Sequence, residues 1–145
     1  MSRVERVIKT SPDKVWEVLA DGWLYPLWVV GASRMRDVEN HWPSVGAQLH
    51  HSVGSWPVLL DDTTEVLESK APSVLRLRAR AWPTGEAEVV LHLEPHAEGT
   101  RVVIEEDAVS GPGRLVPRPA RTAGLVWRNT EALQRLAYLA ERRTQ

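Results

Sequence analysis

The hydrophobic pattern of this chain of 145 residues begins with a short alternating segment and then changes to helical spacing. Residues 3–10 predict a first strand, and residues 11–21 predict a helix. Ser11 and Pro12 support its start: a serine at the N-cap accepts a bond from a free helical N–H, and a proline at the first position lacks only an N–H that needs no partner. Gly22 is a typical residue for its end.

A second and much longer helical pattern closes the chain at residues 122–142. Its apolar face repeats every three or four residues, as on a helix that covers a core. The members of this face are Leu125, Asn129, Ala132, Leu136 and Leu139.

Between the two helices, apolar and polar residues alternate, which is typical of strands with one buried face. The alternation is clearest in residues 74–82, where leucines and alanines face one way and Arg76, Arg78 and Arg80 face the other. The further strands expected here cover residues 33–39, 47–53, 58–68, 74–82, 87–94 and 100–108.

This order of elements predicts an α+β fold in a single domain, residues 1–145. A long amphipathic helix needs a surface to bury its apolar stripe, and an antiparallel sheet needs one face covered. We therefore expect a curved seven-stranded antiparallel sheet wrapped around the C-terminal helix, with a short helical segment after the first strand. The arrangement leaves an apolar hollow between sheet and helix.

The register of the fourth and fifth strands decides how the three arginines are interpreted. Pairing Val66 with Leu75 places Glu65 opposite Arg76 and Asp61 opposite Arg80, while Glu88 falls near Arg78 or Arg80 from the other side. Opposite charges on neighbouring strands contribute about 0.2–1 kcal/mol each. We therefore interpret the arginines as a cross-strand ladder and not as a nucleic-acid surface.

The order of strand, short helix, six strands and long helix resembles the helix-grip fold of the START-like superfamily, and in particular its polyketide cyclase/dehydrase and lipid-transport branch, also called SRPBCC proteins. The resemblance covers nearly the whole chain. It implies an apolar cavity that holds a lipid, sterol, polyketide or similar molecule, in carriers as well as in cyclases. It rests on residues 11–21, Trp28, Gly46, residues 65–68 followed by Pro72, Glu94–Pro95, Gly99–Thr100 and Arg128–Asn129.

Composition and charge exclude several classes of function. A net charge of -1 gives no basis for nucleic-acid binding, and the lack of cysteine excludes disulfides and thiolate chemistry. Charged residues stand where a signal peptide needs an apolar run, and no stretch has the apolar length of a membrane span. We expect a cytoplasmic monomer or weak homodimer that is not stably inserted in membranes.

Two carboxylates, Asp62 and Glu106, are expected on the apolar face of the sheet. A buried charge has to be paired, hydrogen-bonded or neutralised, so each is a candidate general acid or base, or else a partner of Arg128. His50 and His51 are neighbours on a strand, so one of them must face the cavity. The five histidines show no zinc spacing, and we expect no metal and no cofactor.

Two segments are expected to flank the cavity mouth as a gate. The first is residues 23–31, with Trp28 as a ligand contact outside the central core. The second is residues 111–119, whose prolines and glycines oppose regular structure. An alternative is that Trp23, Tyr25 and Trp28 are fixed core residues. Asn129 either binds a ligand carbonyl or ties the last helix to a strand. The expected ligand contacts are Trp28, His50, Trp56, Asp62, Leu77, Val89, Ile104, Glu106, Asn129 and Leu136.

Three functions remain open from the sequence. The first is binding of a small hydrophobic molecule that is lipid-like, polyketide-like or quinone-like. The second is an aromatase/cyclase-type enzyme that acts on a polyketide-like substrate with Asp62, Glu106 or an inward histidine. The third is a regulatory or interaction module without a natural ligand.

Overall fold

A computed structural model describes residues 2–30, 32–55, 58–81, 85–111 and 115–142 of the chain. The described residues form seven strands, two α-helices of nine or more residues, one 3₁₀ turn and one single-turn helix. In chain order these elements are β1 (Ser2–Ile8), α1 (Pro12–Ala20), η1 (Gly22–Leu24), α2 (Tyr25–Trp28), β2 (Ala32–Val38), β3 (Gln48–Ser55), β4 (Val58–Lys70), β5 (Val74–Ala81), β6 (Gly85–His96), β7 (Gly99–Ser110) and α3 (Arg118–Arg142).

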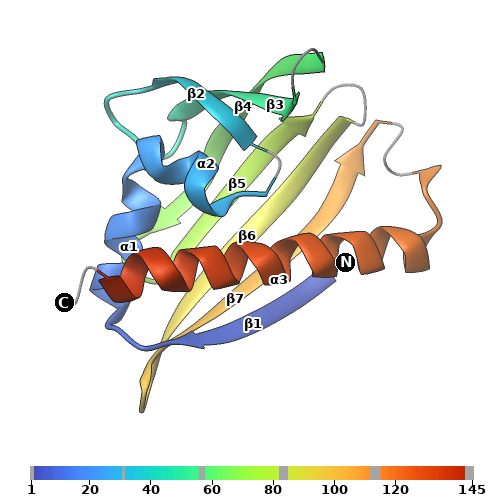
Figure 1. The fold of residues 1–145 in the computed structure, drawn as a ribbon. Helices are drawn as coiled ribbons and strands as arrows, with labels where there is room; N and C mark the ends of the chain where they lie inside the picture. The colour runs from blue at the N-terminus through green and yellow to red at the C-terminus, as the bar shows by residue number, and fades with distance from the viewer. Residues whose placement is uncertain (1, 31, 56–57, 82–84, 112–114, 143–145) are drawn as a thin grey trace.

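The strands form one antiparallel sheet in the order β1-β7-β6-β5-β4-β3-β2. The sheet curves, and α3 runs across its concave side while α1 and α2 lie together near the C-terminal half of α3 (Figure 1). This architecture confirms the helix-grip fold expected from the sequence. It also brings the first strand next to the last one, because β1 pairs with β7 along its whole length.

The start of α1 follows the local chemistry that the sequence indicates. The Ser11 hydroxyl accepts a hydrogen bond from the Lys14 N–H at 3.4 Å, and Pro12 occupies the first turn. The helix buries Val15, Val18 and Leu19 in the core that α3 shares.

The apolar segment after α1 folds back onto the sheet as η1 and α2. Gly22 allows this close approach, because a Cβ at this position would lie 2.6 Å from the Leu49 side chain. Tyr25 and Trp28 point inward and join the buried core, whereas Trp23 is 57% exposed. The expectation that Trp28 lies outside the central core is therefore wrong, because α2 directs its side chain into the buried core.

The last helix begins at Arg118, four residues earlier than the pattern predicts. Pro119 lies in its first turn, where the missing N–H needs no partner. The expectation that residues 111–119 stay outside regular structure is thus wrong for Arg118 and Pro119. The buried side of α3 packs against β1, β7, α1 and α2 and consists of Asn129, Ala132, Leu133, Leu136, Ala137 and Ala140.

From Thr64 to Val66, the register of β4 with β5 differs by two residues from the expected one, so that Val66 lies opposite Leu77 and Glu65 opposite Arg78. Because this shift is even, the same side chains face the core. A bulge between Val66 and Glu68 adds one residue to the shift, and Glu68 lies opposite Arg76. Glu88 lies opposite Arg78, as expected, and binds it at 3.1 Å. The side chain of Asp61 lies outside the described part of the chain.

Candidate functional site

A cavity of about 410 Å³ lies between the concave face of the sheet and the first half of α3. Strands β5, β6 and β7 form its floor, α3 forms one wall, and α2 with His51 of β3 forms the opposite wall. The apolar side chains that line it are Tyr25, Trp28, Val29, Val30, Leu77, Ala79, Ala87, Val89, Ile104, Ala108, Leu125 and Ala132. The cavity is therefore mainly apolar, with polar groups at a few places.

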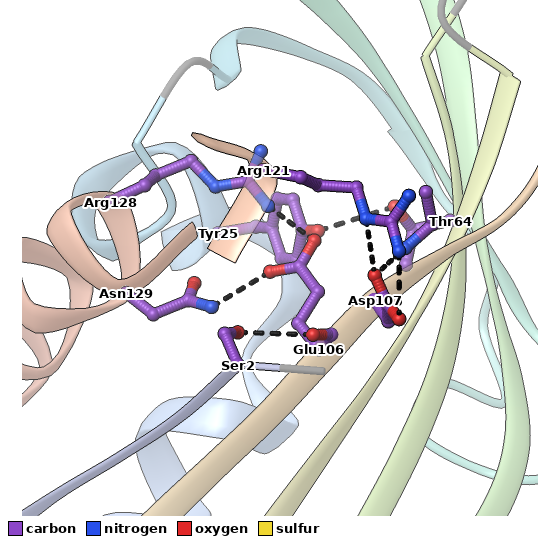
Figure 2. A network of polar contacts seen from close by, with 9 residues as sticks. Ser2, Tyr25, Thr64, Glu106, Asp107, Arg121, Arg128 and Asn129 are labelled. Atoms are coloured by element: carbon purple, nitrogen blue, oxygen red, sulfur yellow. Dashed lines mark hydrogen bonds and ion pairs between the residues drawn. The ribbon is translucent and has the colours of Figure 1, made fainter. Parts of the chain in front are cut away.

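One polar group in the cavity is the carboxylate of Glu106, which is 3% exposed. The alternation of β7 turns it inward together with Val102 and Ile104. Arg128 forms an ion pair with one carboxylate oxygen, and the Asn129 amide donates to the other at 2.9 Å (Figure 2). Two successive residues of α3 thus compensate the buried charge, which is what a carboxylate at this depth requires.

A second polar group joins α2 to the sheet through three buried side chains. The Tyr25 hydroxyl lies 3.3 Å from the Thr64 hydroxyl, and His51 Nε2 lies 2.9 Å from the same oxygen. Tyr25 and His51 line the cavity, whereas Thr64 lies behind them in the wall. Burial raises the pKa of Tyr25 above its usual 10.0, against the lowering by its hydrogen bond to Thr64. The phenol therefore keeps its proton at neutral pH.

A third polar region lies at the edge of the cavity, near the start of α3. Arg121 binds Asp107 at 2.9 Å, and Arg80 binds Glu86 at 3.6 Å. Burial acts to raise the pKa of Asp107, but the hydrogen bond from the Ala108 N–H and nearby positive charge, including Arg121, outweigh it. The pKa of Asp107 therefore lies below its usual value, and the carboxylate is ionised at neutral pH.

The structure brings together six of the side chains that the sequence indicates as ligand contacts: Trp28, Leu77, Val89, Ile104, Glu106 and Asn129 line the cavity. Their part in binding stays a prediction.

Four of the expected ligand contacts are placed differently or are not described. His51 and not His50 lines the cavity, and Leu136 lies in the core instead of the cavity wall. Trp56 lies outside the described residues, as does the side chain of Asp62. The proposed catalytic role of Asp62 therefore stays a prediction.

Among the described residues of the two expected gate segments, those that line the cavity belong to residues 23–30. Tyr25, Trp28, Val29 and Val30 line the cavity, while none of the described residues 111 and 115–119 does so. That either segment acts as a gate stays a prediction.

Tyr25 and Arg121 are among the site residues that the sequence does not indicate as functional candidates. A tyrosine three residues before Trp28 shares one face of a helical turn with it, and this spacing is the signal that points to Tyr25. No comparable signal marks Arg121, because its partner Asp107 becomes its neighbour only when α3 crosses the sheet.

Within the described part of the chain, no group of three or more histidine, aspartate or glutamate side chains is arranged to hold a metal ion. The described helices include none with the length and apolar character of a membrane span.

A model of the family described as polyketide cyclase/dehydrase and lipid transport matches residues 2–141. The chain belongs to this family. Membership of this family supports a fold that binds hydrophobic ligands. No curated protein sequence matches the chain.

Solved structures with the same fold include a protein from Nitrosomonas europaea and two proteins described by a biosynthetic pathway or locus. Protein NE0264 from Nitrosomonas europaea shares 18% identity over 98% of this chain and 94% of its own, with a TM-score of 0.75. The di-domain ARO/CYC StfQ from the steffimycin biosynthetic pathway shares 12% identity, with a TM-score of 0.75, over 98% of this chain and 50% of its own. DynU16, a putative protein in the dynemicin biosynthetic locus, shares 24% identity, with a TM-score of 0.69, over 97% of this chain and 46% of its own. The chain thus spans about half of the last two proteins, and these likenesses show the fold alone.

Proposed function

We propose that this chain binds one small, mainly apolar molecule in the cavity between the sheet and α3. The observation that carries the proposal is the cavity itself, which has an apolar lining interrupted by a few placed polar side chains. Binding sites for small molecules have this composition, because apolar walls supply most of the free energy and a few polar groups fix the orientation.

The size of the cavity favours a compact occupant. A volume of about 410 Å³ lies in the lower part of the range of roughly 300–1,000 Å³ that is typical of such sites. A single ring system of the polyketide or quinone kind suits this volume better than a lipid with two acyl chains.

The second candidate is an enzyme of the aromatase/cyclase type. The observation that favours it is that Tyr25, His51 and Glu106 line one cavity, so groups able to donate or accept protons would surround a bound substrate. The ARO/CYC description of StfQ points in the same direction, although at 12% identity it supports only a shared scaffold.

Native mass spectrometry of the protein purified from its own host tests the proposal first. A co-purifying mass of a few hundred daltons supports binding, and conversion of that compound by the protein supports the enzyme. An empty protein that also binds no neutral dye favours a module without a ligand and contradicts the proposal.

A matched pair of variants tests whether the cavity is the site. Ala132 lines the cavity and Ala123 is exposed on the same helix. Ala132→Leu should weaken binding of a neutral solvatochromic dye at least fivefold because the larger side chain takes cavity volume, whereas Ala123→Leu should leave it unchanged. Equal binding by both variants would place the dye elsewhere.

A further inference from the structure

The protons of the three linked side chains Tyr25, Thr64 and His51 can be arranged in two ways. Thr64 has one hydroxyl proton and lies between the Tyr25 hydroxyl and His51 Nε2, so it donates to at most one of them. The imidazole nitrogen donates or accepts according to its tautomer. The chain of hydrogen bonds can therefore run in either direction.

Each direction leaves the Tyr25 hydroxyl in a different state. When Tyr25 donates to Thr64 and Thr64 donates to His51, the phenol oxygen has lone pairs left to accept a bond. When His51 donates to Thr64 and Thr64 donates to Tyr25, the phenol proton is left to donate. Within the described residues, the hydroxyl has no other hydrogen-bond partner than Thr64. It can therefore accept a bond from a ligand hydroxyl in the first arrangement and donate one to a ligand carbonyl in the second.

The rings around this hydroxyl hold it at the cavity wall. Tyr25 contacts Trp28 edge to face, with ring centroids 5.4 Å apart at 69°, and it lies 5.4 Å from the tilted His51 ring. All three rings line the cavity. This wall of aromatic rings suits a flat, unsaturated ligand.

The charges around the cavity favour a ligand without a net charge. The three arginines that line it are each paired with a carboxylate: Arg80 with Glu86, Arg121 with Asp107 and Arg128 with Glu106. An acidic ligand would have to displace one of these carboxylates, and burial of an unpaired charge is costly.

We propose that the Tyr25 hydroxyl, oriented by Thr64 and His51, anchors a neutral carbonyl or hydroxyl group of the bound molecule. This inference rests on the proposed binding function and adds the chemistry by which the ligand is chosen. Thr64 acts as a positioning residue, because it does not itself line the cavity.

Four probes with one ring system test the inference: naphthalene, 2-naphthol, 2-acetylnaphthalene and 2-naphthoate, each displacing the neutral dye. For each probe, the dissociation constant for Tyr25→Phe is divided by that for the wild type. Because both constants refer to the same probe in water, its hydration cancels in the ratio. One net hydrogen bond corresponds to about a three- to tenfold change in affinity. Tyr25→Phe should weaken 2-naphthol and 2-acetylnaphthalene by that factor and leave naphthalene within twofold.

The control is Tyr138→Phe, which removes the hydroxyl of an exposed tyrosine on α3 and should change no affinity. Thr64→Val should weaken the two oxygen-bearing neutral probes less than Tyr25→Phe does, because the phenol remains but loses its orientation. In the wild type, 2-naphthoate should bind more weakly than either of them.

The outcomes separate the two proposals. If no probe displaces the dye and the dye itself does not bind, the binding function is wrong. If all probes bind and Tyr25→Phe changes their affinities equally, or changes only thermal stability, the hydrogen-bond chain merely fastens α2 to the sheet and the anchor is overturned. Preferential binding of 2-naphthoate would overturn the selection for neutral ligands.

Discussion

Replacement of Arg128 by methionine tests how far the buried carboxylate of Glu106 depends on its partner. The variant keeps most of the apolar stem and removes the charge, leaving Asn129 as the remaining side-chain partner of Glu106 among the described residues. Breaking a fully buried ion pair costs about 3–5 kcal/mol, whereas an exposed pair contributes about 0–1 kcal/mol. Glu106 is 3% exposed and the Arg128 side chain 38%, so we expect Arg128→Met to lower the free energy of unfolding by about 2 kcal/mol.

A double-mutant cycle with Glu106→Gln isolates the interaction of the two residues. Glutamine retains the shape and removes the charge, so Arg128→Met should cost only about 0.5 kcal/mol in that background, giving a coupling energy of about 1.5 kcal/mol. Urea unfolding measures each variant. For a domain of this size a loss of 2 kcal/mol corresponds to a fall in Tm of about 4–8 °C.

The control is Arg135→Met on the same helix, which breaks an ion pair with Glu131 whose members are both exposed. It should cost less than about 0.5 kcal/mol. If Arg128→Met costs no more than this control, or costs the same with and without Glu106→Gln, the carboxylate is not held by Arg128 and the reasoning fails.

Three further predictions concern packing, acid stability and the cavity wall. Gly22→Ala should lower the free energy of unfolding by about 1–3 kcal/mol because the new Cβ has no room. Gly124→Ala, in open space on α3, should raise it by about 0.5–1 kcal/mol. Equal effects of the two variants in thermal unfolding would contradict both expectations. Because the pKa of Asp107 is lowered from 3.8, its contribution to stability is complete above that pH and is lost as the pH falls through the lowered value. In Asp107→Asn, the free energy of unfolding measured in urea should therefore fall less steeply as the pH is lowered than it does in the wild type. The same pH dependence in both proteins would contradict this prediction. Trp28→Ala should lower stability by about 3 kcal/mol and also weaken dye binding; full stability with lost binding would instead support a gate.

Much of the fold follows from local patterns in the sequence. The alternation in residues 74–82 and 87–94 indicates which face of the sheet is buried. The alternation in residues 100–108 predicts that Glu106 faces inward, with Arg128 as a possible partner. The stripe of the last helix likewise placed Asn129 against the sheet. These inferences hold because alternation and helical spacing depend on neighbouring residues alone.

The remaining features depend on contacts that no local pattern records. The hydrogen bond between His51 and Thr64 is one such feature, because it requires β3 to pair with β4. The choice of His51 over His50, in contrast, follows from the alternation of His51 with Leu49. The link from Tyr25 to these strands requires α2 to fold back over the sheet. The start of α3 differs from the prediction because a proline such as Pro119 indicates a break in most positions but is well suited to the first turn of a helix.

The pairing of β1 with β7 has a consequence for the chain during its synthesis. Ser2 donates its hydroxyl hydrogen bond to the main-chain oxygen of Glu106, 104 residues further along. At roughly 5–20 residues per second, the first strand waits on the order of 5–20 s for its partner to leave the ribosome. The last helix follows β7 along the chain, so the concave face of the sheet stays uncovered until α3 has also emerged. The nascent chain is therefore prone to aggregate in this interval, and its ligand cavity closes only once α3 packs onto the sheet.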